Sequence, residues 1–316
     1  VSGLASSSHT PSVWSNVSSL AMGVNPPTDN GCAGIKGLAY SVTSGATGTP
    51  TTMNLPGAAT SRTVGLTSSS SGQYFNIRAV DNVDYPPAGT ASAGPYYVDL
   101  TAPAVPAVTI ASGAAYTSGL SVAVTASTSD TYSGPYQMRY SADNSTWSAW
   151  YTYTASARTI DLSANGGNAN EGVKTLYVQV RDQAGNMSTA GSDTIQYMKL
   201  PVLSAATTSS LENVTDAYYR FTGTDITGIT AVKFGTATLT STLADDWYQG
   251  YFRTISDTVL YVYPPQGLVS GNYAVTPVNP AGTGTGLSVA ATSSTQTSRS
   301  CPPPTTGRQP AMGPGP

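Results

Sequence analysis

Charged residues are scarce in this chain, and their scarcity excludes several classes of function. Asp, Glu, Lys and Arg make up 9% of the 316 residues, and the formal net charge at pH 7 is −3. Typical soluble domains carry about a quarter of charged residues. No basic surplus is present that would attract a nucleic acid or an anionic membrane surface. No run of about 18 apolar residues occurs, so the sequence predicts no membrane span.

Histidine and cysteine, which often carry nucleophilic or metal chemistry, are nearly absent as well. The chain holds one histidine, His9, and two cysteines, Cys32 and Cys301. A Ser/His/Asp site would need His9 beside a positioned serine and an acid, and no catalytic motif surrounds it. The cysteines lie far apart and form no metal-binding spacing, although Cys301 can pair with a second chain. The sequence therefore predicts a protein that is not an enzyme, with a structural role for His9.

Helical periodicity with capping residues is missing, and the pattern that is present is the alternation of a β-strand. Within residues 175–188, Leu176, Val178 and Val180 alternate with larger polar side chains, as on a strand with one buried face. The strand is expected to stop at a tight turn, Asp182–Asn186, where Asp and Asn side chains can bond the backbone. This strand and its turn are the clearest structural signal in the chain.

The same strand-and-turn pattern occurs about one sandwich length earlier, in Tyr74–Asn82. Short alternating runs separated by turn residues continue through the chain, which contains 32 Gly and 22 Pro. Such spacing is typical of β-sandwiches. The sequence predicts an all-β fold of three tandem Ig-like β-sandwich domains with a Pro-rich extended C-terminal tail. The predicted boundaries are residues 1–103, 104–199 and 200–290 for the domains and residues 291–316 for the tail.

The first two modules resemble known repeats. In the first, residues 4–16 (LASSSHTPSVWSN), residues 29–41 (DNGCAGIKGLAYS) and residues 94–103 (GPYYVDLTAP) resemble fibronectin type III-like and Ig-like repeats of large bacterial surface and secreted proteins. One departure is Val83–Pro87, where those repeats have an AGN turn. The second module resembles a bacterial Ig-like repeat through the segments MRYS, WSAW and VRDQAGNMS between residues 133 and 188.

The third module resembles a different family. Residues 223–235 (GTDITGITAVKFG) resemble the opening signature of IPT/TIG domains, and residues 262–283 resemble their second half. Gly223 and Gly228 are expected to permit bends. Pro277 removes a backbone donor, so the last core strand is expected to end there or to lie at an edge. Residues 245–253 (DDWYQGYFR) are interpreted as an aromatic insertion. The resemblance implies a further Ig-like sandwich, and such folds carry many functions.

Calcium is the one metal for which the sequence offers ligands. Asp29, Asp81 and Asp84 are expected to approach one end of the first module, and Asp130 and Asp182 one end of the second. Calcium takes about six to eight oxygen ligands, a number that the sequence does not demonstrate. The side chain of Asp182 can also bond backbone groups of the turn after the second-module strand, which would explain this residue without a metal. No cofactor is therefore predicted, and bound calcium is the alternative.

Aromatic side chains and the tail supply the predicted partner contacts. Trp147, Trp150, Tyr151 and Tyr153 either stack on sugars or pack on their own sandwich, with Trp147 expected in the core. Rigid aromatics in the apparent insertion suit an interface, and the alternative is a loop folded over its own sandwich. The predicted assembly or partner contacts are Trp247, Tyr248, Tyr251, Phe252, Cys301, Pro302, Pro303 and Pro304.

These features together favour a non-catalytic structural protein that is extracellular and attached to the cell surface. The leading hypothesis is a self-assembling subunit of a bacterial surface filament or sheath, or an adhesin stalk, joined through β-edge and tail contacts. Its expected partners are copies of itself or other surface proteins, with no nucleic acid. One alternative is a polysaccharide-binding set of accessory modules from a secreted enzyme. Another is a phage tail or decoration protein.

Overall fold

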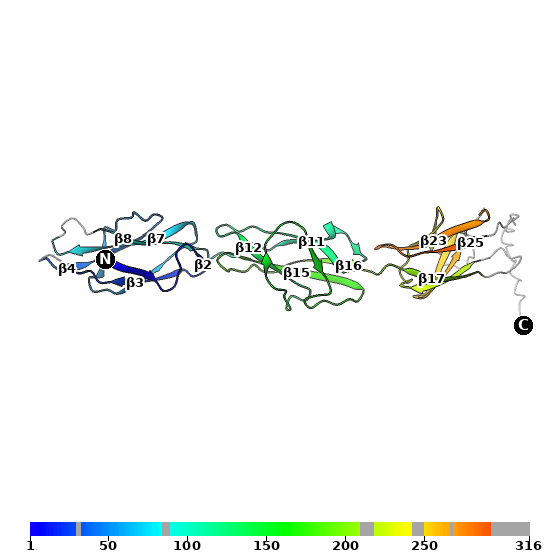
Figure 1. Ribbon diagram of the computed structural model, residues 1–316, viewed down its shortest axis with the longest axis horizontal. Helices are drawn as coiled ribbons and strands as arrows, with labels where there is room; N and C mark the ends of the chain where they lie inside the picture. The colour runs from blue at the N-terminus through cyan, green and yellow to red at the C-terminus, as the bar shows by residue number, and fades with distance from the viewer. Residues whose placement is uncertain (30–32, 84–88, 209–217, 242–249, 266–267, 292–316) are drawn as a thin grey trace, which may run out of the picture. The chain divides into compact units, whose positions relative to one another are not determined.

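The computed structural model describes residues 1–29, 33–83, 89–208, 218–241, 250–265 and 268–291. Within these ranges every regular element is a β-strand, apart from one short 3-10 helix, η1 (Ala111–Gly113) (Figure 1). The chain divides into two compact units, Val1–Tyr197 and Met198–Pro316. The predicted all-β sandwich fold is confirmed.

The first sandwich consists of two sheets that enclose one core. Its three-stranded sheet has the order β1 (Ser2–Ser6), β3 (Ser19–Asn25), β6 (Ser61–Gly65). Its five-stranded sheet has the order β2 (Trp14–Ser15), β8 (Ala91–Val98), β7 (Ser69–Asp81), β4 (Ile35–Thr43), β5 (Met53–Pro56). Alternate residues of β3, β4 and β7 meet between the sheets, including Leu20, Met22, Leu38, Phe75 and Ile77. The period-2 pattern of residues 74–82 therefore marks a core strand, as predicted.

The second sandwich repeats this arrangement. Its three-stranded sheet has the order β14 (Arg158–Asp161), β11 (Ser121–Ser127), β9 (Ala107–Ile110). Its five-stranded sheet has the order β10 (Tyr116–Thr117), β16 (Gly191–Tyr197), β15 (Gly172–Asp182), β12 (Pro135–Ser141), β13 (Tyr151–Thr152). Strand β15 alternates as predicted, because Leu176, Val178 and Val180 are buried in the core. Gly185, in the turn that follows, has a left-handed φ of 96°.

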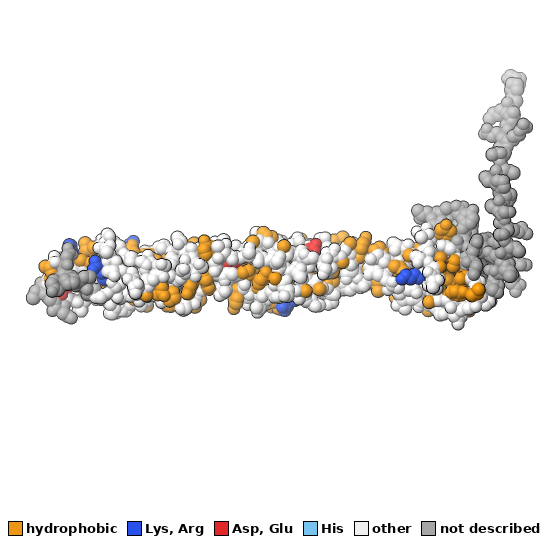
Figure 2. All heavy atoms as spheres, turned by 90° about the horizontal axis from the view of Figure 1, so that it is seen from above, with side chains coloured by type: hydrophobic (Ala, Val, Ile, Leu, Met, Phe, Trp, Pro, Cys, Tyr) orange, Lys and Arg blue, Asp and Glu red, His pale blue; other side chains and the backbone are white. Residues whose placement is uncertain are grey.

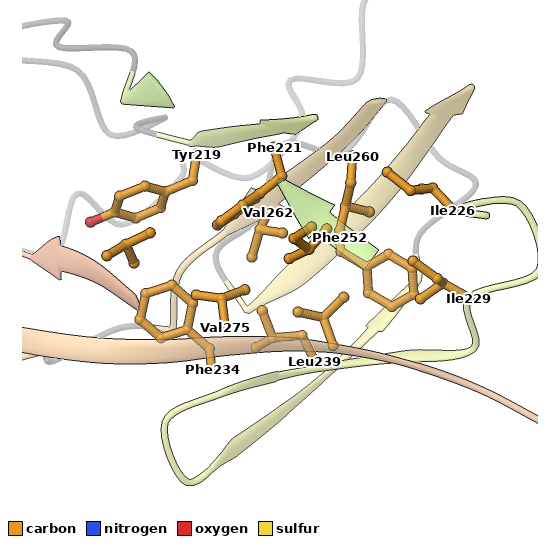
Figure 3. Close-up of a cluster of buried hydrophobic side chains, with 13 residues drawn as sticks. Tyr219, Phe221, Ile226, Ile229, Phe234, Leu239, Phe252, Leu260, Val262 and Val275 are labelled. Atoms are coloured by element: carbon orange, nitrogen blue, oxygen red, sulfur yellow. The ribbon is translucent and has the colours of Figure 1, made fainter. Parts of the chain in front are cut away.

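The third sandwich is formed by one continuous sheet folded around its core (Figure 3). The strand order is β17 (Val202–Thr208), β18 (Tyr219–Thr224), β22 (Val259–Tyr263), β21 (Tyr251–Ser256), β20 (Ala237–Ser241), β19 (Ala231–Phe234), β23 (Gly271–Asn279), β24 (Gly282–Thr283), with β25 (Leu287–Ala291) also paired to β23. Strands β20 and β21 run parallel and join the two halves through only two residue pairs. Val232 and Phe234 alternate into the core, as predicted.

Pro277 neither ends the last core strand nor lies in an edge strand, contrary to both predicted alternatives. Strand β23 continues to Asn279 and pairs with β19 through Pro277 itself. On its other side β23 pairs with β25 up to Val275 and with β24 from Val278. Pro277 thus lies where the neighbouring strand changes, a place where a missing backbone donor interrupts no regular ladder.

Three separate buried clusters, one in each sandwich, lie within the three predicted modules. The exact boundaries after residues 103, 199 and 290 stay predictions. Strand β25 runs to Ala291, whose side chain is buried, so the last sheet extends one residue beyond the predicted boundary. Residues 292–316, which include most of the predicted tail, lie outside the described residues.

Candidate functional site

Most of the predicted contact residues lie outside the described residues. This holds for Trp247, Tyr248, Cys301, Pro302, Pro303 and Pro304, and also for Cys32 and Asp84. Tyr251 and Phe252 are described, and they open strand β21 instead of continuing an insertion. That part of the insertion interpretation is corrected, because residues 251–253 pair with β22 inside the sheet.

Phe252 points into the core of the third sandwich, where it packs near Leu260 and Val262 (Figure 3). Its side chain is fully buried. Burial of this apolar ring stabilises the sandwich, so the residue can be explained without a partner protein. Phe252 is therefore not available as a surface contact in this fold. Tyr251 is half-buried at the start of the same strand and remains a predicted contact.

Trp147 and Trp150 lie beside two arginines on the five-stranded sheet of the second sandwich. The Arg139 guanidinium lies 4.7 Å from the Trp147 ring centroid and 4.6 Å from that of Trp150, and the Arg181 guanidinium lies 4.5 Å from Trp150. Arg139 also donates to Gln179 Oε1. Trp147 is half-buried and absent from the core cluster, which corrects the expectation that it is a core residue. Cation–π packing on the sheet surface accounts for its position instead.

His9 is buried and hydrogen-bonded at both ring nitrogens. Its Nδ1 lies 2.9 Å from Ser8 Oγ and its Nε2 lies 2.9 Å from the carbonyl oxygen of Val17. Because that carbonyl can only accept, Nε2 carries the proton and Nδ1 accepts from the serine. The imidazole edge also packs against Tyr96, at a centroid distance of 6.1 Å. These contacts join two segments of the first sandwich, which agrees with the structural role predicted for His9.

Three aspartates, Asp99, Asp130 and Asp182, converge at one place and form what we call the acidic cluster. One carboxylate oxygen of each lies within 4.8 Å of the others. Asp182 ends strand β15, Asp130 lies in the loop before β12, and Asp99 directly follows β8 of the first sandwich. The predicted proximity of Asp130 and Asp182 is thus borne out by the described residues. Asp99, which joins them from the neighbouring module, is not predicted from any local sequence pattern.

Hydrogen bonds hold two of these carboxylates rigidly in place. Asp182 Oδ1 accepts from the backbone N–H groups of Gly185 and Asn186 at 2.7 and 2.9 Å, and its Oδ2 accepts from Asn186 Nδ2 at 2.8 Å. Asp99 Oδ2 accepts from the N–H and hydroxyl of Ser133 at 3.1 and 2.7 Å. Asn186 Nδ2 also donates to the carbonyl oxygen of Asp99 at 2.9 Å. The linker after β8 is therefore bound to the second sandwich.

Asp130 is satisfied at only one of its oxygens. Its Oδ1 accepts from the backbone N–H groups of Gly134 and Tyr132, at 2.8 and 3.2 Å. Its Oδ2 is buried from solvent and has no hydrogen-bond partner among the described residues. Burial raises the pKa of Asp182, the hydrogen bonds from Asn186 and Gly185 oppose this shift, and the charge of Asp99 adds to it. The cluster therefore concentrates negative charge in a poorly solvated place.

Two of the three first-module acids, Asp29 and Asp81, lie among the described residues. Asp29 Oδ2 accepts from the backbone N–H of Gly34 at 2.6 Å, and Asp81 Oδ1 accepts from that of Val83 at 3.1 Å. With Asp84 outside the described residues, the expected three-carboxylate group at that end stays a prediction. In the part of the chain that the structure describes, the acidic cluster is the group of carboxylates spaced to hold a metal.

Exposed sheet edges are the second feature with functional potential. Strands β1, β9, β17 and β25 each lie at the edge of a sheet, and their residues include no charged side chain and no proline. Three other edges are protected, since β6 contains Arg62, β14 contains Arg158 and Asp161, and β5 ends in Pro56. The edge strands β2, β10, β13 and β24 are only two residues long. On the face shown in Figure 2, charged side chains are few among the described residues.

No family model matches the chain, and no curated protein matches it. Solved structures resemble it at low similarity. The FN1–FN3 domains of chicken CNTN1 are 10% identical, with a TM-score of 0.27, over 92% of this chain and 98% of that chain. The fibronectin(III)-like modules of Clostridium thermocellum CbhA are 12% identical, with a TM-score of 0.32, over 62% and 95% of the two chains.

A third similar structure is the Bacteroides ovatus SGBP-B protein of a mixed-linkage glucan utilization locus, solved with a mixed-linkage heptasaccharide. It is 12% identical, with a TM-score of 0.21, over 88% of this chain and 65% of that chain. Among the described residues, no helix has the length and apolarity needed to cross a membrane. None of these similarities assigns a function, and the IPT/TIG and bacterial surface-repeat resemblances stay predictions.

Proposed function

We propose that this chain is a non-catalytic structural protein of the cell exterior whose copies assemble by pairing at exposed sheet edges. The observation that carries the proposal is that four edge strands of at least four residues contain neither a charged residue nor a proline. Soluble proteins usually protect such edges with lysines, prolines or bulges, because an open edge presents unpaired N–H and C=O groups to other chains. A second copy that adds a strand would satisfy these groups.

Strand β17 is the edge best suited to this role. It pairs with β18 on one side, and its other side makes one isolated bridge, from Val202 to Thr285. Ser204, Ala205, Ala206 and Thr207 are all exposed. The small uncharged side chains leave room for an incoming strand and impose no charge repulsion between copies. Strand β25, which directly precedes residues 292–316, is likewise an edge strand without charged residues.

A charge placed on this edge tests the proposal. Purified protein is imaged by electron microscopy and followed by light scattering over a series of concentrations, with wild type, Ala206→Lys and Thr240→Lys compared. Thr240 is equally exposed but lies on β20, which pairs on both sides, so Thr240→Lys is the matched control. We expect ordered assemblies from wild type and Thr240→Lys, and isolated molecules from Ala206→Lys.

Two results would contradict the proposal. Wild-type protein that stays monomeric at every concentration would remove self-assembly as its function. Assembly that is unchanged in Ala206→Lys would move the contact away from β17. Circular dichroism of each variant confirms that the fold is intact, so that a loss of assembly reports on the edge alone.

Polysaccharide binding has less support from the geometry. Arginine side chains occupy ring faces of both Trp147 and Trp150, which a stacked sugar would need. A glycan pull-down with wild type and Trp147→Ala tests this alternative, and retention that depends on Trp147 would favour it. Copurification with virions would favour the alternative of a phage tail or decoration protein.

A further inference from the structure

We infer that the acidic cluster of Asp99, Asp130 and Asp182 binds a single calcium ion that fixes the linker after β8 to the second sandwich. This goes beyond edge assembly, because it concerns how neighbouring modules are joined within one chain.

The charge of the cluster is uncompensated by protein. Asp99 and Asp182 are at most 1% exposed, and one oxygen of each lies within 4.8 Å of an oxygen of Asp130. Among the described residues, no lysine, arginine or histidine forms an ion pair with any of the three. Buried carboxylates without a counter-charge are costly, and the usual remedies are a paired cation, a bound metal or a proton.

The buried Oδ2 of Asp130 is the independent sign of a missing partner. Polar atoms that are removed from water nearly always have a hydrogen-bond partner. This oxygen has none among the described residues, although its sister Oδ1 accepts two backbone N–H groups. Those two bonds orient the carboxylate and hold its free oxygen in place. An oxygen arranged in this way is ready to coordinate a cation.

The ligand atoms identify the ion by class. All three side chains offer oxygen atoms as ligands. Hard cations such as calcium and magnesium prefer oxygen ligands, whereas zinc and copper also favour nitrogen and sulfur ligands. The carboxylates come from three separate segments, after β8, before β12 and at the end of β15. Calcium accepts such irregular arrangements and completes about six to eight ligands with water, whereas magnesium demands near-ideal octahedral geometry. The hydrogen bonds from Ser133, Gly185 and Asn186 orient the ligands from outside the site.

One bound calcium would link residues that are far apart in sequence. Asp99 belongs to the segment that leaves the first sandwich, while Asp130 and Asp182 belong to the second. The ion would add to the hydrogen bonds that Asp99 already accepts from Ser133. Calcium would therefore stabilise the second sandwich and stiffen the linker at the same time, and removing it would loosen both.

The test is calcium titration of the full chain after treatment with a chelator and dialysis into metal-free buffer. Isothermal titration calorimetry is expected to show one site per chain. Thermal unfolding is expected to shift upward by about 10 °C at a calcium concentration about 100-fold above the dissociation constant. Asp130→Asn should weaken binding by more than about tenfold and reduce the shift at the same calcium concentration by about half or more. Asp161→Asn, an exposed aspartate of the same sandwich, is the matched control and should bind as wild type does.

The rival is a proton shared between the carboxylates, which would satisfy Asp130 Oδ2 without a metal. In that case wild-type protein would show neither binding heat nor a thermal shift at about 10 mM calcium, above the range of weak extracellular sites. That result would overturn the inference, and it does not depend on any variant folding. Equal affinity of Asp130→Asn and wild type would overturn it as well, and magnesium binding as tight as calcium binding would overturn the identity of the ion.

Discussion

At the scale of single residues, two buried tyrosines differ in the hydrogen bonding of their hydroxyl groups. The hydroxyl of Tyr219 donates to the carbonyl oxygen of Ala290 at 2.9 Å, which joins β18 to β25. The hydroxyl of Tyr140 is buried without a partner among the described residues, and burial raises the pKa of Tyr140 to about 12. The same substitution by phenylalanine should therefore have opposite effects at the two positions.

Tyr219→Phe is expected to lower the free energy of unfolding by about 1 kcal/mol, because the carbonyl of Ala290 loses its donor. Tyr140→Phe should leave the stability unchanged or raise it by about 1 kcal/mol, because it removes a buried group that has no partner. Urea denaturation of both variants checks the pair. A clear destabilisation by Tyr140→Phe would mean that its hydroxyl has a partner in solution, such as an ordered water.

A second residue-scale prediction concerns acid sensitivity. Backbone N–H groups of Thr146 and Ser145 donate to Asp143 Oδ1 at 2.6 and 2.8 Å, and the Thr146 hydroxyl donates to its Oδ2 at 2.8 Å. These bonds hold the pKa of Asp143 well below its usual range. A carboxyl whose pKa is depressed on folding contributes stability above its unfolded pKa and loses it as the pH falls through the folded value.

Asp143→Asn should therefore be less stable than wild type at pH 7, and the difference should narrow as the pH falls from about 5 to about 2. Urea denaturation at both ends of this range measures the difference, with tryptophan fluorescence reporting on the second sandwich through Trp147 and Trp150. A difference that stays constant with pH would show that the turn depends on side-chain shape and gains nothing from the charge.

At the scale of elements, Gly223 has a role other than the predicted bend. A Cβ on Gly223 would lie 1.9 Å from the carbonyl oxygen of Val202, and one on Gly284 would lie 1.9 Å from that of Pro201. The start of β17 thus passes closely against both halves of the third sandwich. Gly228 does take a left-handed φ of 90°, as a turn requires.

Gly223→Ala should destabilise the third sandwich by about 1–3 kcal/mol, because the start of β17 must move away from β18. Gly271→Ala is the matched control, since its Cβ would make only an ordinary contact, 3.8 Å from the Tyr273 ring. Urea denaturation of both variants is the measurement. Equal stability of the two variants would show that β17 moves aside without cost.

The elements also show what the sequence can predict. Alternation identified β7 and β15 because one face of each strand is buried and every second side chain must be apolar. The prediction of a surface contact was wrong for Phe252, because strand β21 begins inside the aromatic-rich segment and buries this side chain. The prediction of a core position was wrong for Trp147, because an arginine packs on its ring at the sheet surface. The turn chemistry of Asp182 was visible locally, whereas the approach of Asp99 depends on how two modules meet. Such contacts between distant segments leave no local pattern.

At the scale of the whole molecule, folding and assembly are expected to depend on different parts of the chain. Val289 and Ala291 of β25 are buried, and every residue of the described core cluster of the third sandwich precedes residue 292. Removing residues 292–316 should consequently change the free energy of unfolding by no more than about 0.5 kcal/mol. If contacts from this segment join the copies, as its composition favours, the same deletion should abolish assembly.

The deletion becomes decisive when it is combined with two other variants. Cys301→Ser in the full chain tests whether a disulfide between chains is needed, since assembly without this thiol would exclude it. Ala206→Lys tests the β17 edge independently. Assembly that is lost in the deletion and in Ala206→Lys, but kept in Cys301→Ser, would mean that residues 292–316 and an open edge act together, as an inserted strand and its acceptor do. Assembly that persists in the deletion would assign the contact to the edges alone, and electron microscopy at matched concentrations distinguishes these outcomes.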